Sequence, residues 1–230
     1  MFLTFVGCSS CATSSYFFGP GDLFREKRKS FIKIDVYKNI QLTQTSTTNT
    51  STTSNVEKYE IYLRSSASGF IVGHDREITL VATSAHVCTI TFGNQINYFI
   101  KDYSQHDPNW KLTERGRYVL NDYKGRVYAA IPIKYDMRSD ICILGTSLIP
   151  LPPLKISRSP PLIGEKYYNI AAPMGLWSSK MIPLFDGYYL GAMKMRSDRR
   201  LSYVFSIPTK GGSSGSPIIN GYGEVVGATH

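Results

Sequence analysis

The segment from Glu77 to Cys88, Glu-Ile-Thr-Leu-Val-Ala-Thr-Ser-Ala-His-Val-Cys, is a run of strand-favouring residues that leads into a histidine. Ile, Val and Thr are branched at Cβ and pack well on a pleated surface, so they are enriched in β-strands. The residues just before His86, 83–85, are small. We therefore expect a strand that ends next to His86.

Short runs of the same kind follow one another from Val56 to the end of the chain. They are rich in Ile, Val, Tyr and Thr, and clusters of Gly, Pro, Asn and Asp separate them. They occupy residues 59–65, 68–73, 116–120, 125–135, 140–144, 166–172, 186–195, 201–207, 216–220 and 224–229. Helical periodicity is hard to find. The sequence therefore predicts an all-β protein, built as a sandwich or as barrels.

The composition is that of a packed globular protein. Hydrophobic residues make up 42% of the 230 residues and charged residues 19%, which excludes a wholly disordered chain. The formal net charge of +9 would suit an anionic surface. The basic residues are nevertheless spread along the chain, with a single run at 25–29, and no nucleic-acid motif is present. We expect no nucleic-acid partner.

Residues 1–30 are expected to form a tail outside the folded units. Met1 to Gly7 are apolar and precede Cys8, an arrangement that resembles the end of a bacterial lipoprotein signal. The segment lacks the basic residues and the full apolar length of a secretory signal, so a disordered tail is the alternative. The first interpretation places the protein in the cell envelope or outside the cell, with membrane attachment only if Cys8 is lipidated. The second leaves it cytoplasmic.

Residues 31–56 are predicted to connect this tail to the folded part. Apolar and polar residues alternate over 32–36, which indicates one short strand. Residues 42–55 are mostly Thr, Ser and Asn and predict a linker, because they cannot bury apolar surface. We therefore expect residues 1–55 to be dispensable for catalysis.

Three prolines divide the folded part roughly in half. Pro150, Pro152 and Pro153 lack backbone donors, so their segment cannot lie in a central strand and predicts a crossing between two units. We place the first unit at residues 57–149 and the second at 150–230.

The four cysteines do not form a metal-binding pattern. Cys8 and Cys11 are spaced like half of a zinc site, but no second Cys or His pair lies nearby in the sequence. We expect Cys88 and Cys142 to be buried thiols, the commonest state of unpaired cysteines, so that reduction does not unfold the protein. The alternative is a bridge between Cys88 and Cys142.

The segment from Lys210 to Pro217, Lys-Gly-Gly-Ser-Ser-Gly-Ser-Pro, is a glycine-rich turn with Ser214 near its centre. Glycines allow backbone conformations in which successive N–H groups converge on one point, where they can bind an oxyanion. The alternative is a flexible loop, which Gly, Ser and Pro also favour. A base near Ser214 would decide between the two, because a serine hydroxyl is a poor nucleophile without one.

Among the four histidines, His86 is the best candidate for that base. It closes a long β run, whereas His74 and His106 lie in polar segments typical of the surface, and His230 is terminal. A buried structural role is the alternative for His86.

A carboxylate is needed to orient such a histidine. Asp140 opens the alternating strand 141–144, where a rigid element could fix it among apolar neighbours. Asp136 lies four residues earlier in a polar turn and is the alternative.

Three blocks of sequence resemble the signatures of the chymotrypsin-like serine peptidases. They are residues 83–88 around His86, 140–144 after Asp140 and 212–217 around Ser214, in the order of that family. Residues 68–72 and 220–227 match as well, so the resemblance covers about residues 57–230. The Gly-Ser-Pro ending and the lack of a second cysteine just before the histidine block are most similar to the bacterial glutamyl-endopeptidase and HtrA-like branches.

This resemblance implies two six-stranded Greek-key β-barrels packed at right angles. It implies a catalytic triad in which the first barrel supplies His86 and Asp140 and the second supplies Ser214, with the backbone N–H groups of Gly212 and Ser214 as the oxyanion hole. It implies hydrolysis of peptides or proteins through an acyl-enzyme, without metal or organic cofactor. A weak or inactive protease-fold binding module, anchored in the envelope, is the alternative.

The resemblance also places the specificity pocket at Pro208, Thr209 and Lys210. No Asp stands there, which disfavours cleavage after Arg or Lys, whereas Lys210 would suit an acidic side chain. Residues 223–230 resemble the strand that follows the nucleophile, after which the family has a further segment. We therefore expect the second barrel to be incomplete at its C-terminal side.

Overall fold

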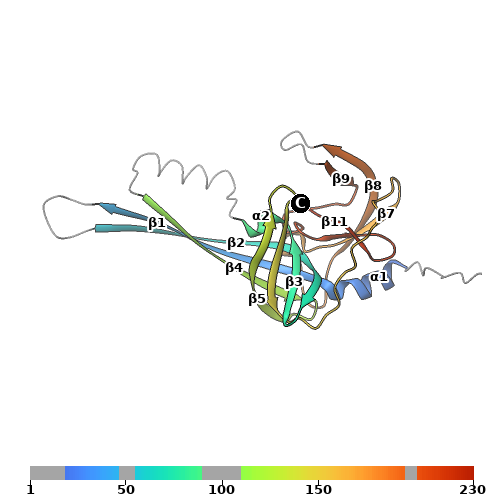
Figure 1. Cartoon of the computed structure of the whole chain (residues 1–230), viewed down its shortest axis with the longest axis horizontal. Helices are drawn as coiled ribbons and strands as arrows, with labels where there is room; N and C mark the ends of the chain where they lie inside the picture. The colour runs from blue at the N-terminus through green and yellow to red at the C-terminus, as the bar shows by residue number, and fades with distance from the viewer. Residues whose placement is uncertain (1–18, 47–54, 90–109, 195–200) are drawn as a thin grey trace, which may run out of the picture.

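A computed structural model describes residues 19–46, 55–89, 110–194 and 201–230 of the chain (Figure 1). Strands dominate it, and the all-β prediction is confirmed. The first unit contains β1 (Phe31–Ser46), β2 (Asn55–Asp75), β3 (Ile78–Thr83), β4 (Trp110–Asp122), β5 (Val127–Asp136) and β6 (Ile141–Ser147). The second contains β7 (Lys166–Ile170), β8 (Leu184–Lys194), β9 (Leu201–Phe205), β10 (Pro217–Ile219) and β11 (Val225–Ala228). The helical elements are α1 (Pro20–Lys27), α2 (Ala85–Cys88) and the 3-10 turns Arg28–Ser30 and Pro173–Gly175.

The six strands of the first unit form a closed barrel in the order β1-β2-β3-β6-β5-β4. Neighbouring strands are antiparallel. Side chains that alternate along the strands fill the interior, including Ile34 of β1, Ile71 of β2, Val81 of β3, Leu120 of β4 and Leu144 of β6, all of them fully buried. The barrel is therefore a packed core and gives its loops a rigid base.

The second unit is an open sheet in the order β11-β10-β7-β8-β9. Five strands appear in its described part, in agreement with the expectation of a second barrel that is not closed. Ile170 and Ile219 of this sheet pack with Phe31 and Phe70 of the barrel in one buried cluster. This shared core joins the two units.

β1 is a full barrel strand, which corrects the predicted domain boundary. It pairs with β2 from Phe31 to Ser46 and with β4 from Ile32 to Gln44. The first unit therefore begins at Phe31 and not at residue 57. The predicted linker fails for a physical reason, because Thr is a good strand residue and backbone pairing on both sides does not require apolar side chains. Residues 47–54 of that linker lie outside the described residues.

β1, β2 and the start of β4 extend beyond the barrel as a long three-stranded ribbon, with β1 in the middle (Figure 1). Within this ribbon, Ile40 of β1 lies opposite Ile61 of β2 and Glu114 of β4. Ile40 is fully buried. The ribbon therefore buries an apolar side chain at this position of its central strand.

The segment before β1 is not simply a tail. α1 packs Leu23, which is fully buried, into the cluster that the two units share. The predicted signal remnant at residues 1–18 lies outside the described residues. No helix in the described part of the chain is long and apolar enough to span a membrane.

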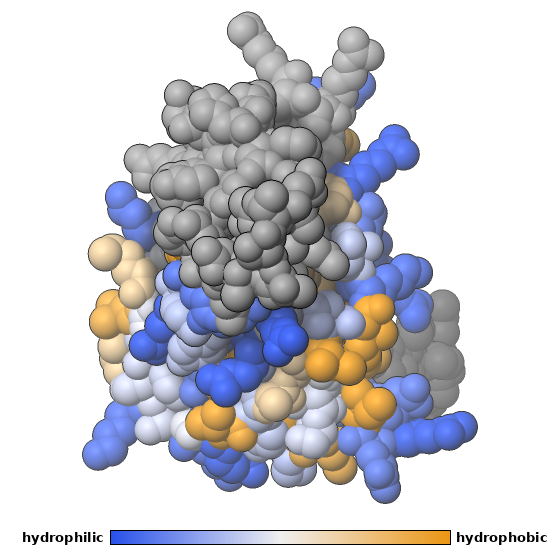
Figure 2. All heavy atoms as spheres, turned by 90° about the vertical axis from the view of Figure 1, so that its left-hand side faces the viewer, coloured by the Kyte–Doolittle hydropathy of each residue, from blue (hydrophilic) through white to orange (hydrophobic). Residues whose placement is uncertain are grey.

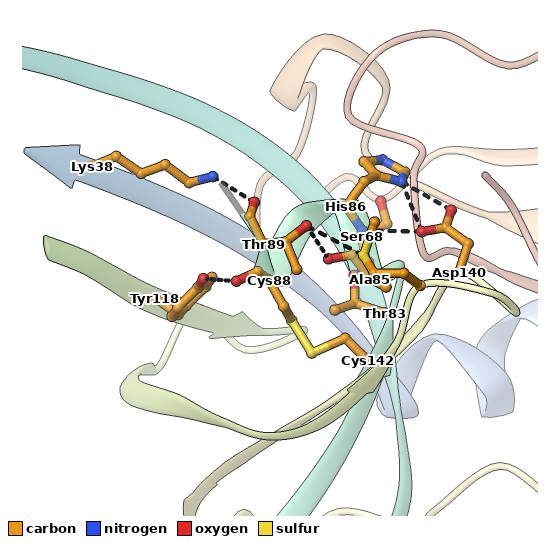
Figure 3. The surroundings of a disulfide bond; sticks show 11 residues. Lys38, Ser68, Thr83, Ala85, His86, Cys88, Thr89, Tyr118, Asp140 and Cys142 are labelled. Atoms are coloured by element: carbon orange, nitrogen blue, oxygen red, sulfur yellow. Dashed lines mark hydrogen bonds and ion pairs between the residues drawn. A yellow bond between two sulfur atoms is a disulfide. The ribbon is translucent and has the colours of Figure 1, made fainter. Parts of the chain in front are cut away.

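Cys88 and Cys142 form a disulfide bond, with their Cα atoms 6.4 Å apart (Figure 3). The prediction of two buried thiols is therefore wrong, although both residues are buried. Cys88 and Cys142 are 54 positions apart in the sequence. They lie close together in space because β3 and β6 are neighbouring strands and Thr83 lies opposite Cys142.

Hydrophilic and hydrophobic residues are interspersed on the face shown in Figure 2. β5 is the most exposed strand of the barrel, and its side chains at Val127, Ile131 and Ile133 are more than half accessible. Apolar atoms at a protein surface are common, so scattered residues of this kind do not by themselves indicate a site.

Candidate active site

His86 lies on α2, a single helical turn that follows β3. The strand ends at Thr83, and Ser84 in an extended conformation leads into the helix. Thr83, Ser84 and Ala85 are fully buried, which explains why small residues stand there. The side chain of His86 is 38% exposed, so a well-anchored imidazole remains accessible to a substrate.

Asp140 lies in the turn between β5 and β6, and its carboxylate contacts His86 twice. Oδ2 lies 2.9 Å from the ring Nδ1 of His86, and Oδ1 accepts a hydrogen bond of 3.0 Å from the His86 backbone N–H (Figure 3). An acceptor at Nδ1 keeps the proton on that nitrogen and leaves Nε2 as the basic one. The structure thus brings these two predicted residues together.

The backbone of Asp140 has a φ of +52°, in the left-handed region that is uncommon for residues other than glycine. The cost of such a conformation is of order 1 kcal/mol and persists only where the surroundings enforce it. Only 10% of the side chain is exposed. The turn therefore fixes a nearly buried carboxylate beside the imidazole.

Asp136, the alternative acid, points elsewhere. It is exposed at the end of β5 and accepts hydrogen bonds from the Ser139 hydroxyl and from the backbone N–H of Arg138. These two bonds hold the pKa of Asp136 below its usual value. Asp136 thus stabilises its own turn, and no hydrogen bond joins it to His86 in the described structure.

The turn that carries Ser214 is closed by its own backbone. The N–H of Ser213 donates to the carbonyl of Lys210, and the N–H of Ser216 donates to the carbonyl of Ser213, each at 2.9 Å. The carbonyl of Ser214 accepts a bond of 2.9 Å from the N–H of Ser68 on β2. A half-buried serine is therefore held between the second sheet and the barrel.

Glycine is required on both sides of Ser213 and Ser214. Gly212 has a φ of +96° and Gly215 one of +82°. A Cβ at Gly212 would lie 2.6 Å from the carbonyl oxygen of Ala172, closer than real contacts allow. The glycines predicted from the sequence to shape this turn therefore have a steric reason.

The Ser214 turn rests directly on the segment before His86. A Cβ at Gly215 would lie 2.2 Å from Oγ1 of Thr83 and 2.7 Å from the backbone nitrogen of Ser84. The hydroxyl of Ser84 also donates to the carbonyl of Thr229, just past β11. Gly215, the residue after Ser214, therefore packs against the backbone of Ser84, which lies two residues before His86.

Three backbone N–H groups of the turn, those of Gly211, Gly212 and Ser214, have no hydrogen-bond acceptor among the described residues. That of Ser213 is bonded within the turn, and that of Gly215 donates to Thr229. Buried N–H groups are nearly always paired, so unpaired ones in a turn suggest an anion site. Gly212 and Ser214 are the two residues that the sequence predicts for the oxyanion hole.

Sequence reasoning missed two polar residues that hold this turn. Ser68, fully buried, donates its hydroxyl hydrogen to the carbonyl of Gly212 and accepts a bond from the N–H of Ala172. Asn169, also fully buried, donates to Oγ of Ser216 and to the carbonyl of Pro217. For Asn169 the available signal was a polar residue inside an otherwise apolar strand, whereas Ser68 lies among other small polar residues and gave no such signal.

A cavity of about 800 Å³ lies between the two units. The barrel contributes Ser139 and Ile141, the neighbours of Asp140. The second unit contributes β9 together with Ile207, Thr209, Ile218 and residues 226–230. Of the three predicted specificity residues, Thr209 lines the cavity, whereas Pro208 and Lys210 are exposed and are not among its lining residues.

Metal ligands do not cluster in the described residues, where no group of three or more His, Cys, Asp and Glu side chains could hold an ion. The site instead offers an imidazole and a carboxylate in contact, and a hydroxyl in the turn that packs against the residues before the imidazole. This set can activate a nucleophile by moving a proton.

Comparison with solved structures identifies the fold. The chain resembles the Rv3671c protease of M. tuberculosis in an inactive form, with a TM-score of 0.56 and 18% identity over 90% of this chain and 79% of that one. A second similar structure is the serine endoprotease from Yersinia pestis, with a TM-score of 0.55 and 15% identity over 90% of this chain and 55% of that one. At these identities the likeness is one of fold.

Comparison of sequences identifies the family. No curated protein matches the sequence. A profile of the trypsin-like peptidase domain matches residues 67–227, well over half of the chain. The match includes β3, β6 and the Ser214 turn, which carry the three signature blocks. The chain therefore belongs to the trypsin-like peptidase domain family of serine proteases, and its fold is chymotrypsin-like.

Proposed function

We propose that this protein is a serine endopeptidase with Ser214 as nucleophile, His86 as general base and Asp140 as the residue that orients the base. The double contact of Asp140 with His86 is the observation that carries the proposal. The packing of the Ser214 turn against Thr83 and Ser84 supports it, because that contact brings the serine to the same end of the barrel.

Each step of peptide hydrolysis has a residue to perform it. Nε2 of His86 takes the proton from the Ser214 hydroxyl as Oγ attacks the peptide carbonyl, and then gives this proton to the leaving amine. The carboxylate of Asp140 stabilises the imidazolium that forms in between. Water, activated by the same imidazole, then hydrolyses the acyl-enzyme and restores the serine.

The negative charge of the tetrahedral intermediate would be bound by backbone N–H groups. Those of Gly212 and Ser214 have no acceptor within the described residues and lie on either side of Ser213. A preorganised donor of this kind contributes about 2.7–4 kcal/mol to lowering the barrier. No metal or organic cofactor takes part in this mechanism.

The substrate side chain would enter the cavity between the units. Arg138 and Thr209 are among the polar residues that line it, and no described lining residue is acidic. A cationic side chain would therefore find no carboxylate partner there, whereas an acidic one could pair with Arg138. We propose a preference for acidic over basic residues before the scissile bond, to be measured with peptides that differ only at that position.

Active-site labelling tests the proposed nucleophile. A fluorophosphonate probe should label the full chain, and Ser214→Ala should abolish labelling while circular dichroism remains that of the folded protein. Ser213→Ala is the matched control, because the neighbouring hydroxyl lies in the same turn. Equal labelling of wild type and Ser214→Ala would overturn the assignment of the nucleophile, and a folded wild type that neither labels nor cleaves peptides would overturn the enzymatic function.

A further inference from the structure

A disulfide bond runs beside the contact between His86 and Asp140 (Figure 3). Cys88 follows His86 by two residues on α2, and Cys142 follows Asp140 by two residues on β6. α2 and the segment that runs from Asp140 into β6 are therefore joined in two ways. One is the set of hydrogen bonds to the Asp140 carboxylate, and the other is the covalent bond between the sulfur atoms.

α2 has little structure of its own to keep His86 in place. It is a single turn of four residues, and Ser84 makes no side-chain capping bond. One helical turn is unfavourable in isolation, because several backbone dihedral angles are fixed for one hydrogen bond. The position of α2 therefore depends on its contacts with the barrel.

Two side chains anchor the carbonyl end of α2 to other strands. The hydroxyl of Tyr118 on β4 donates to the carbonyl of Cys88 at 2.7 Å, and Nζ of Lys38 on β1 donates to the carbonyl of Thr89 at 2.9 Å (Figure 3). Neither of these bonds reaches β6. The disulfide is the covalent link to the strand that begins just after Asp140.

The β6 end of the disulfide is rigid. Cys142 is fully buried and lies opposite Thr83 of β3 and Tyr135 of β5 in the barrel. A short covalent bridge from this strand limits how far α2 can move or rotate. Such a limit would preserve the hydrogen bonds between His86 and Asp140, since these bonds depend on distance and angle.

We propose that the Cys88–Cys142 disulfide is a positioning element for catalysis, which keeps the imidazole of His86 on the Asp140 carboxylate. This inference rests on the proposed function of these two residues. The disulfide takes no part in the chemistry and acts only through α2. A displacement of about 1 Å in a catalytic group can cost about a hundredfold in rate. We expect loss of the disulfide to lower kcat by about 10- to 100-fold and to leave KM nearly unchanged.

The test uses the full chain in a Cys8→Ala/Cys11→Ala background, in which Cys88 and Cys142 are the only cysteines. This background is compared with the same chain carrying Cys88→Ala and Cys142→Ala in addition. Ile149→Ala is the control for general destabilisation, because this buried residue follows the opposite end of β6. Reduction of the background protein with a phosphine is the second route, since it opens the bridge while both sulfur atoms remain.

Two readouts separate positioning from general loss of structure. The first is kcat per folded molecule, with the folded fraction measured by circular dichroism at the assay temperature. The second is the proton NMR signal of the His86 Nδ1–H, which a strong hydrogen bond to carboxylate moves far downfield. Both cysteine loss and reduction should lower kcat and broaden or remove this signal. Ile149→Ala should leave both unchanged per folded molecule.

The outcomes distinguish this inference from the proposed function. Unchanged kcat per folded molecule and an unchanged downfield signal without the disulfide would overturn the positioning role. A rate that falls only in proportion to the unfolded fraction would overturn it too. If the wild type has no peptidase activity, the proposed function fails, and the downfield signal with and without the bridge still decides whether the disulfide positions His86. If the double variant does not fold, the same two measurements on the reduced protein decide between the outcomes.

Discussion

The hydroxyl of Ser68 donates a hydrogen bond to the carbonyl oxygen of Gly212, 144 positions away in sequence. The same oxygen of Ser68 accepts a bond from the N–H of Ala172. One buried hydroxyl on β2 therefore ties the proposed nucleophile turn to the end of β7 and sets the orientation of the Gly212 peptide.

Ser68→Ala should therefore reduce activity although Ser68 does not touch the substrate. The change leaves two buried polar groups without a partner, at a cost of about 1–3 kcal/mol each. We expect kcat for peptide hydrolysis and the rate of fluorophosphonate labelling to fall by about 10-fold or more. Ser65→Ala on the exposed part of the same strand is the control, and equal loss in both variants would contradict a role for the Gly212 contact.

Asp140→Asn and Asp136→Asn should have opposite outcomes. An amide at position 140 cannot hold the imidazole with its proton on Nδ1, and loss of such a carboxylate lowers kcat by about 10⁴-fold in enzymes of this mechanism. Asp136 bonds only within its own turn, so Asp136→Asn should stay within about threefold of wild type. Steady-state kinetics on one peptide measures both, and a larger loss in Asp136→Asn would reverse the assignment of the acid.

Reduction of the disulfide should also destabilise the fold. A bridge that closes a loop of 54 residues restricts the unfolded chain, with a stabilisation of about 4 kcal/mol by loop entropy. Denaturant unfolding with and without reductant gives the difference directly. Coincident unfolding curves would mean that the bridge adds no stability, the result that the sequence alone predicts.

Deletion of residues 1–46 should prevent folding. The deletion removes β1, which pairs with both β2 and β4 and contributes Ile32, Ile34 and Val36 to the barrel core. A deletion that ends at residue 18 removes no described element and is the comparison. Circular dichroism and peptidase activity of the two proteins decide the matter, and a folded, active chain without β1 would contradict the closed barrel.

Acid should weaken one ion pair between the connection after β6 and β11. A hydrogen bond from Lys155 lowers the pKa of Glu224 below its usual value of 4.5. A depressed carboxyl pKa stabilises the fold above the unfolded value, and this stabilisation is lost as the pH falls through the folded value. Glu224→Gln should therefore lower Tm at pH 7 and by less at pH 3. Lys155→Met should give the same pattern, and a deficit that does not depend on pH would contradict the pairing.

Local patterns predicted most of the strands and indicated the candidate residues of the site. The alternation of residues 141–144 and the glycines around Ser214 are short-range features, and each has a direct steric or packing cause. The order of His86, Asp140 and Ser214 along the chain indicated the family. These elements were predictable because neighbouring residues alone determine them.

Pairing between residues far apart in the sequence could not be predicted from local patterns. The Thr-rich end of β1 has no apolar alternation, and only the two flanking strands make it part of the barrel. The bridge between Cys88 and Cys142 depends on β3 and β6 being neighbours, which no local pattern states. Ser68 and Asn169 were missed for the same reason, since their partners lie far along the chain.

The central place of β1 has a consequence for how the protein is made. Ile32 pairs with Gly69 on one side and with Asp122 on the other, so the first barrel strand to leave the ribosome waits for a partner that is synthesised much later. At about 5–20 residues per second, Asp122 is synthesised roughly 5–18 s after Ile32. During that interval one edge of β1 has no partner and can pair with other nascent chains. Closure of the barrel must wait longer still, until synthesis has passed β6, the strand that joins β3 to β5.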